Sequence, residues 1–388
     1  MRVFLVVLDS VGIGGAPDAA AYGDVGADTL GHVLRFIPDG GLPNLRRLGY
    51  RAIQGTSFYQ PGETAQGCYG SLQPVSAGKD TTTGHWEIAG IHLDKPFPLF
   101  HDGFPAEAIA QFEKATGRGV LGNVAASGTA IIQEFGGEQA LTGKWIVYTS
   151  ADSVFQVAAH EDVIPVEELY RGCEAARAIL QGPWGVARVI ARPFSGRQGA
   201  FARTDRRRDF SLSPVRPTML DKLHDVGIPV VAVGKIQDIF ADSGITEAIH
   251  THDNADGIKQ TLALASSETL GKGLVFTNLV DFDMKFGHRR DPQGYAEALM
   301  QADAGLGQIM EALHDDDMLV VTADHGCDPL MPGTDHTREC VPLLVWGKGI
   351  KQGVDLGTLE GFYHISATIL DAFGMEPLCG NSFLPKLL

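Results

Sequence analysis

The stretch Val3-Phe-Leu-Val-Val-Leu8-Asp9 consists of six apolar residues followed by an aspartate. A short run that is apolar on both faces is typical of a strand buried within a parallel sheet. Two later runs repeat the pattern: residues 274–280 precede Asp283, and residues 318–322 precede Asp324. Because ligands of open parallel sheets bind at the carboxyl ends of the strands, we expect these three aspartates to meet in one site.

Short apolar runs alternate with helical patterns along the rest of the chain. This alternation predicts an α/β protein with a mostly parallel sheet flanked by helices. Further strands are expected at residues 145–148, 186–190, 230–233 and 343–346, and helices at residues 105–116, 166–181, 219–226, 258–267, 294–313 and 366–373.

The chain has 388 residues, which favours two domains over one core. Prolines mark two breaks, Lys95-Pro-Phe-Pro98 and Ser213-Pro-Val-Arg-Pro217. We predict that residues 95–215 form an inserted, smaller α/β cap domain, and that residues 1–94 and 216–388 form one metal-binding catalytic core domain. Two sequential domains are the alternative, but the motifs on both sides of the insertion favour a single core.

The formal net charge of -16 argues against a nucleic-acid partner and against docking on anionic lipid. An anionic metabolite can still bind where basic groups or metal ions collect locally. The five cysteines include no CxxC pair, which is typical of reduced thiols in a cytosolic protein. No apolar run approaches the roughly 18 residues of a membrane span, so we expect a cytoplasmic enzyme without a membrane partner, and we favour a monomer.

Histidines accompany two of the aspartates. His288 follows Asp283 by five residues, His325 follows Asp324 directly, and His336 comes eleven residues after His325. Carboxylates combined with imidazoles suit Mn²⁺, Fe²⁺ or Zn²⁺ better than Ca²⁺. Six candidate ligands are too many for one catalytic ion and enough for two ions with open positions.

Three successive threonines lie between Gly78 and Gly84, in the stretch Gly78-Lys-Asp-Thr-Thr-Thr-Gly-His-Trp-Glu87. The two glycines favour a tight turn between a strand and a helix. A hydroxyl bound to a metal ion loses its proton more readily, so a threonine here can attack phosphorus. An ordinary threonine-rich turn is the alternative interpretation.

These motifs, taken together, are Asp9, residues 79–87, Asp283-Met-Lys-Phe-Gly-His288, residues 322–326 and Asp335-His-Thr-Arg-Glu339. They closely resemble the prokaryotic phosphopentomutase family of the alkaline phosphatase superfamily, and the resemblance covers nearly the whole chain. It implies an alkaline-phosphatase-like core with an inserted cap. It also implies an isomerase that interconverts ribose or deoxyribose 1-phosphate and 5-phosphate, by way of a phosphothreonine enzyme and a sugar 1,5-bisphosphate.

The resemblance also implies a role for each motif residue. The fixed step before the Gly-His pair selects Thr81 as the nucleophile. The expected cofactors are two divalent ions, Mn²⁺ first among them, with a sugar bisphosphate as activator. The family pattern assigns Asp9, Asp324, His325 and Thr81 to one ion, and Asp283, His288 and His336 to the other.

Seven arginines but only one acid, Asp205, lie between Arg188 and Arg208. In so acidic a protein this cluster indicates an anion site, because guanidinium groups match phosphate oxygens. A solvated basic face is the alternative, and it applies best to residues 206–208. By resemblance, the contacts to the sugar phosphate are Ser150, Asp152, Arg188, Arg203 and Lys235, with Arg188 and Arg203 expected to face a cleft between the domains.

Other functions remain open on the residues alone. A metal-dependent phosphatase or phosphodiesterase would use the same core but release inorganic phosphate. A cofactor-independent phosphoglycerate mutase is longer and uses a serine. A sulfatase is excluded because Leu344 stands where its motif, begun by Cys340-Val-Pro342, requires arginine. A metal-stabilised binding protein would hold metal without turnover.

Overall fold

The computed structural model describes residues 1–39, 41–150 and 152–388. The chain folds into two compact units. Residues Met1–Pro96 and Pro214–Leu388 form the core unit, and residues Phe97–Ser213 form the inserted unit. The chain passes between the units within the two proline-marked stretches. The functions of the two units as catalytic core and cap remain predictions.

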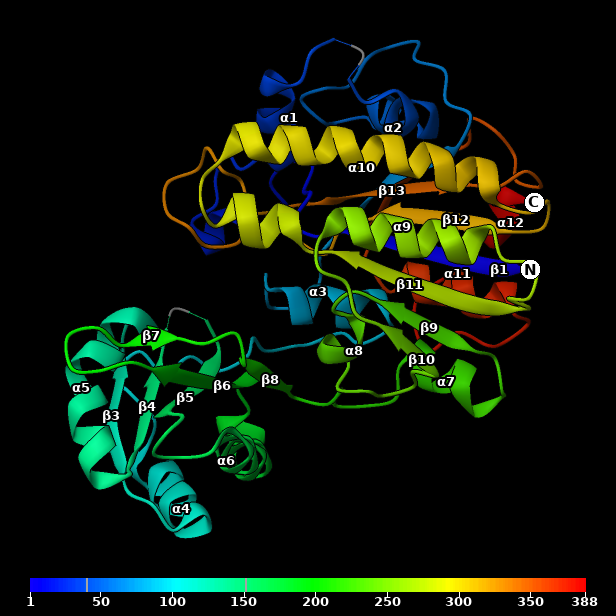
Figure 1. The fold of residues 1–388 in the computed structure, drawn as a ribbon. Helices are drawn as coiled ribbons and strands as arrows, with labels where there is room; N and C mark the ends of the chain where they lie inside the picture. Colours follow the sequence, from blue (N-terminus) through cyan, green and yellow to red (C-terminus); the bar gives the residue numbers. More distant parts are fainter. Residues whose placement is uncertain (40, 151) are drawn as a thin grey trace. The chain divides into compact units, whose positions relative to one another are not determined.

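The described strands of the core unit form an eight-stranded sheet in the order β10-β9-β11-β1-β12-β13-β2-β14 (Figure 1). All neighbours from β10 to β12 are parallel, whereas β13 runs antiparallel to both β12 and β2. The predicted α/β fold with a mostly parallel sheet is therefore confirmed. The strands are β1 (Arg2–Leu8), β2 (Cys68–Gln73), β9 (Val230–Val233), β10 (Glu247–Ile249), β11 (Gly273–Leu279), β12 (Met318–Thr322), β13 (Val341–Trp346) and β14 (Asp355–Glu360).

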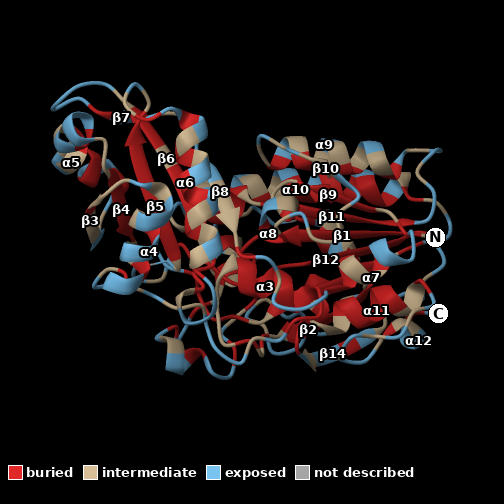
Figure 2. Cartoon of the chain, turned by 90° about the horizontal axis from the view of Figure 1, so that it is seen from below, coloured by how far each residue is buried: buried red, intermediate tan, exposed pale blue. Residues whose placement is uncertain are grey.

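Helices cover both faces of this sheet. Figure 2 shows α9 and α10 on one side of the strands and α3 and α11 on the other. Among the described residues, no helix combines the length and the apolar content that a membrane span requires. The helices of the core unit are α1 (Thr29–Val33), α2 (Pro43–Leu48), α3 (Thr81–Ile88), α7 (Met219–Asp225), α8 (Ile236–Ile239), α9 (Asn254–Ala265), α10 (Pro292–Ala312), α11 (His364–Ala372) and α12 (Leu384–Leu387).

The inserted unit is a second, smaller α/β structure. Its sheet has the order β3-β4-β5-β6-β7, and β8 also pairs with β6. Residues of β4 alternate between two apolar clusters: Trp145 packs with Phe112 and Phe155, and Tyr148 packs with Ile131. Both faces are thus covered by helices. The elements are β3 (Val120–Ala125), β4 (Trp145–Thr149), β5 (Val154–His160), β6 (Arg188–Ser195), β7 (Ala202–Arg203), β8 (Arg208–Ser211), α4 (Ala106–Thr116), α5 (Gly128–Thr142) and α6 (Val166–Ile179).

A buried ion pair fixes the start of β1 against the turn before β12. The guanidinium of Arg2 lies against the carboxylate of Asp317, and the two side chains are 3% and 1% exposed. Arg2 also donates to the carbonyl oxygens of Ala265 at 3.0 Å and Ser267 at 2.9 Å. This side chain therefore also satisfies backbone groups at the end of α9.

Replacement of Arg2 by methionine should lower the free energy of unfolding by roughly 3–5 kcal/mol, because it leaves Asp317 buried and unpaired. Arg46→Met is the matched control, since Arg46 pairs with Glu63 while 48% exposed. The control should cost much less, because an exposed ion pair contributes little to stability. Urea unfolding of both variants measures the difference, and equal losses would contradict the prediction.

Candidate active site

The three strand-end aspartates come from adjacent strands. Asp9 directly follows β1, Asp324 lies two residues after β12, and Asp283 lies in a π-helical turn, residues Phe282–Gly287, after β11. Because β1 lies between β11 and β12, the three carboxylates meet at one edge of the sheet. All three residues are buried, with exposures of 0%, 2% and 7% for Asp9, Asp324 and Asp283.

The π-helical turn explains how Asp283 and His288 act together. The amide of His288 donates to the carbonyl oxygen of Asp283 at 3.1 Å, a step of five residues. Such a widened turn places residues five apart above one another. As a result, His288 Nε2 lies 3.2 Å from Asp283 Oδ2. Its Nδ1 lies 2.6 Å from the carbonyl oxygen of Thr334, which fixes the ring.

The other two histidines complete a continuous cluster. His325 Nε2 lies 3.5 Å from Asp9 Oδ1 and 3.3 Å from Asp324 Oδ2. His336 Nε2 lies 3.3 Å from Asp283 Oδ1, and its ring centre is 4.1 Å from that of His325. The structure thus brings all six predicted metal-ligand residues into one site.

The donor set fits a metal centre. Each aspartate keeps one buried carboxylate oxygen that, among the described residues, has no well-directed hydrogen-bond donor: Asp9 Oδ1, Asp283 Oδ1 and Asp324 Oδ2. Buried polar atoms normally have partners. Two triads also place their ligand atoms within 4.8 Å of one another: Asp9, Asp324 and His325, and Asp283, His325 and His336. Mixed carboxylate and imidazole donors suit a divalent transition-metal ion.

Thr81 lies beside this cluster as the first residue of α3. Its Oγ1 is 3.2 Å from His325 Nε2. The side chain of Asp80 caps the helix by accepting from the amide of Thr83 at 3.1 Å. Thr82 and Thr83 are 6% and 2% exposed, whereas Thr81 is only half-buried. Of the three threonines, Thr81 is therefore the most accessible.

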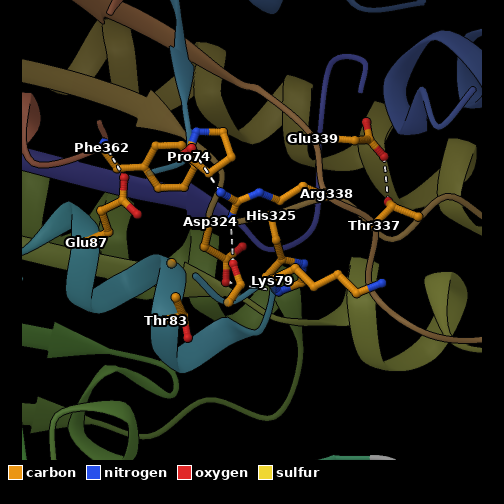
Figure 3. Close-up of a pocket in the computed structure, with 12 residues that line it drawn as sticks. Pro74, Lys79, Thr83, Glu87, Asp324, His325, Thr337, Arg338, Glu339 and Phe362 are labelled. Carbon is orange, nitrogen blue, oxygen red and sulfur yellow. Dashed lines mark hydrogen bonds and ion pairs between the residues drawn. The ribbon is translucent and has the colours of Figure 1, made fainter. Parts of the chain in front are cut away.

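A buried arginine holds the loop that leads into α3. Arg338 is 2% exposed and donates to the carbonyl oxygens of Ser76 at 2.6 Å, Gly78 at 2.7 Å and Pro74 at 3.1 Å. Figure 3 shows this side chain in a pocket together with Lys79 and His325. Since Arg338 follows His336 by two residues, the segment that carries a metal-ligand candidate also supports the loop before Thr81.

The remaining predicted residues lie elsewhere. In the inserted unit, Ser150 directly follows β4, Asp152 is exposed, Arg188 begins β6 and Arg203 ends β7. In the core unit, Lys235 precedes α8, and its Nζ lies 3.9 Å from the sulfur of Met284, next to Asp283. Of the five proposed sugar contacts, Lys235 is the one that belongs to the core unit.

The sequence analysis did not assign three residues of this site. Asn278 donates to Asp9 Oδ2 at 2.8 Å, and its position as an amide within an otherwise apolar strand was the available signal. His85 lies 3.0 Å from Asp324 Oδ2. The sulfur of Cys327 lies within 4.8 Å of candidate ligand atoms of Asp283 and His288, and a lone cysteine gave no signal.

The fold and site define a metal-dependent enzyme, and residues 1–377 match the Metalloenzyme superfamily. The chain is 53% identical to the phosphopentomutase of Clostridium novyi, over 100% of this chain and 99% of that one. It is 54% identical to the phosphopentomutase of Acetivibrio thermocellus, over the full length of both. The chain belongs to the phosphopentomutase family, so the predicted family and the predicted class, a metal-dependent isomerase, are confirmed.

Among solved structures, the PH0037 protein from Pyrococcus horikoshii resembles the chain over 97% of its length and 98% of that protein. The TM-score is 0.50 and the sequence identity is 16%, so the likeness concerns the fold alone. The likeness covers residues of both units. The chain thus shares its α/β fold with that protein.

Metal binding should displace a proton from Asp9. Burial, followed by the charges of Asp324 and Asp283, raises the pKa of Asp9 well above its usual value. A divalent cation must replace the proton held there. Affinity for Mn²⁺ should therefore rise as the pH rises through that pKa. Calorimetric titration of metal-stripped protein in two buffers with different ionisation enthalpies measures the number of protons released when the metal binds. Equal heats and a pH-independent affinity would contradict it.

Proposed function

We propose that the chain interconverts pentose 1-phosphates and pentose 5-phosphates, of ribose or 2-deoxyribose, by way of phospho-Thr81 and a sugar 1,5-bisphosphate. The position of Thr81 Oγ1, 3.2 Å from His325 Nε2, is the observation that carries the proposal. It puts a half-buried hydroxyl beside the histidine that contacts the buried carboxylates of Asp9 and Asp324, in a member of the phosphopentomutase family. A hydroxyl in such surroundings can carry a phosphoryl group.

Two ions are proposed, and Mn²⁺ is the proposed metal. Asp9, Asp324 and His325 would hold one ion next to Thr81. Asp283, His288 and His336 would hold the second. When bound, the ions would supply positive charge that acidifies the threonine hydroxyl and offsets the charge of the moving phosphoryl group.

The proposed cycle begins with phosphate on Thr81, supplied by a sugar bisphosphate activator. A free hydroxyl of the bound sugar phosphate attacks this phosphorus, and the bond from phosphorus to Thr81 Oγ1 breaks. The bisphosphate turns over, Thr81 Oγ1 attacks the phosphorus at the other end, and the bond from that phosphorus to the sugar oxygen breaks. The first sugar hydroxyl loses a proton and the second regains one, so the cycle is balanced in phosphate and protons.

The second phosphate of the sugar is proposed to bind Arg188 and Arg203. Arg203 donates to a neutral partner, the hydroxyl of Tyr148, at 3.3 Å. By contrast, Arg206 pairs with Glu161, and Arg207 pairs with Asp209. Arg188 also lies 3.5 Å from Asp209, so the charge of Arg203 is the better placed of the two to meet a phosphate.

Arg192 adds to the positive charge near Arg203. Burial, followed by the charges of Arg207 and Arg203, lowers the pKa of Arg192 to about 10. Its Nε donates to Oε1 of Gln156, a neutral side chain, at 3.0 Å. Ser150, Asp152 and Lys235 are proposed as further contacts to the sugar.

We also propose that the enzyme acts in the cytoplasm as a monomer. All five cysteines are free thiols, which suits a reducing compartment. Light scattering of the purified protein tests the monomer.

Thr81 should be the only residue that takes phosphate from a sugar bisphosphate. Intact-mass measurement and peptide mapping should find one phosphate there. Thr81→Val, which keeps the size but removes the hydroxyl, should lose both the phosphate and the mutase activity. Thr82→Val is the matched control and should keep both. Phosphate on Thr82 or Thr83, or full activity in Thr81→Val, would rule out the assignment.

A coupled assay of ribose 5-phosphate formation from ribose 1-phosphate, with Mn²⁺, tests the overall reaction. Inorganic phosphate as the sole product would favour a metal-dependent phosphatase on the same core.

Arg203→Ala should weaken binding of the sugar phosphate by roughly 1.5–3 kcal/mol, tenfold or more, because a charged hydrogen bond is lost. A poorly held bisphosphate also escapes or is hydrolysed more often, so phosphate release should rise relative to transfer. Arg206→Ala is the control from the same loop, since Arg206 is 53% exposed and pairs with Glu161. The test is to measure the isomerised sugar phosphate and the inorganic phosphate formed by each variant. Identical behaviour of the two variants would refute the role of Arg203.

A further inference from the structure

We infer that His85 and Asn278 are positioning residues: a buried pair that is hydrogen-bonded to the carboxylate of Asp9 and to the backbone of Thr81, and whose imidazole lies in close contact with the carboxylate of Asp324. The inference rests on the proposed roles of these three residues. His85 is fully buried and Asn278 is 2% exposed. We call the pair the His85–Asn278 relay.

The partners of His85 define its tautomer. Nδ1 lies 2.9 Å from the carbonyl oxygen of Thr81 and 3.0 Å from Asp324 Oδ2. Both neighbours are acceptors, so Nδ1 carries a proton. Nε2 lies 3.3 Å from the amide nitrogen of Asn278, which is a donor, so Nε2 accepts. The imidazole therefore donates from Nδ1 and accepts at Nε2.

The amide of Asn278 is oriented by two acceptors. Its Nδ2 donates to Asp9 Oδ2 at 2.8 Å and to His85 Nε2 at 3.3 Å. The reverse orientation would place an oxygen against both acceptors and is excluded. Because Asn278 occupies Oδ2 of Asp9, the other oxygen, Oδ1, is left to face His325 at 3.5 Å.

Asp324 is hydrogen-bonded at one carboxylate oxygen and in close contact with His85 at the other. Its Oδ1 accepts from the amide of Ser10 at 3.0 Å, and its Oδ2 lies 3.0 Å from His85. A Cβ on Gly84 would lie 2.2 Å from the carbonyl oxygen of Asp324, so only glycine allows α3 to approach this closely. The glycine places His85 within reach of the carboxylate.

The relay thus orients two carboxylates and the start of α3 together. His85 lies on α3 four residues after Thr81, so it joins the helix that carries the hydroxyl to Asp324. Loss of such outer partners of metal ligands typically costs about 10–100-fold in metal affinity. The sugar contacts no relay atom in the proposed mechanism, so the relay should affect kcat more than KM.

The test is calorimetric titration of metal-stripped enzyme with Mn²⁺, combined with its melting temperature. Asn278→Leu and His85→Leu remove the relay and should lower Mn²⁺ affinity about 10–100-fold. His85→Asn places an amide near the Nδ1 position and should recover part of the affinity. His85→Gln places its amide near Nε2 and should recover less. These two conservative variants keep the test valid if the leucine variants do not fold.

Two matched controls separate positioning from general stability. His160 is a buried histidine of the inserted unit that contacts the carbonyl oxygen of Gly196 at 2.9 Å. Asn44 donates to the carbonyl oxygen of Asp303 at 3.1 Å. His160→Asn and Asn44→Leu should lower the melting temperature. They should leave Mn²⁺ affinity unchanged and should not lower kcat relative to KM.

Unchanged Mn²⁺ affinity in all four relay variants would overturn the inference, even if their melting temperatures fall. Failure of the proposed function is distinguishable from this result. If Thr81 carried no phosphate, the relay variants would still lose Mn²⁺ affinity. If the relay had no positioning role, wild-type enzyme would still form phospho-Thr81 while the variants bound Mn²⁺ normally.

Discussion

The burial of three carboxylates at the ends of β11, β1 and β12 is the constraint on which the site depends. Like charges out of water repel one another, and each must find compensation nearby. Burial, with the neighbouring carboxylates, raises the pKa of Asp9. For Asp283, burial alone would raise the pKa, but the charges of His336 and His288 hold this pKa well below its usual value. Surrounding loops therefore supply imidazoles and amide donors rather than apolar packing, as a cation site requires.

The same requirement explains the loop before Thr81. Residues 74–80 form no helix or strand, so their backbone groups need other partners. Arg338 satisfies three carbonyl oxygens, and the carboxylate of Glu87 accepts from the amides of Val75 at 3.1 Å and Ser76 at 2.8 Å. Two buried charges thus hold an irregular loop in one conformation. A hydroxyl at the end of such a loop keeps a fixed position relative to the metal-ligand candidates.

The sequence predicted the features that depend on local pattern. Apolar runs that end in aspartate located β1 and β12, and the strand order then brought Asp9 and Asp324 together. Features that depend on distant contacts were not predictable. The strand expected at residues 186–190 begins at Arg188 and continues to Ser195, where pairing with β5 and β8 decides its length. The His85–Asn278 relay joins residues 193 positions apart, and a π-helical turn leaves no recognised sequence pattern.

In the proposed function, the two units would bind phosphate by two different chemistries. The core unit gathers carboxylates and imidazoles, which attract a phosphate only through bound cations. The inserted unit gathers guanidinium groups, which bind phosphate directly and lose little charge when desolvated. In the proposed cycle the sugar carries a phosphate at each end in turn. A phosphate that is to be transferred needs strong polarisation, whereas the other needs only to be held and released. Ions suit the first task and arginines the second, which gives a protein with a net charge of -16 a reason to concentrate arginines in one segment.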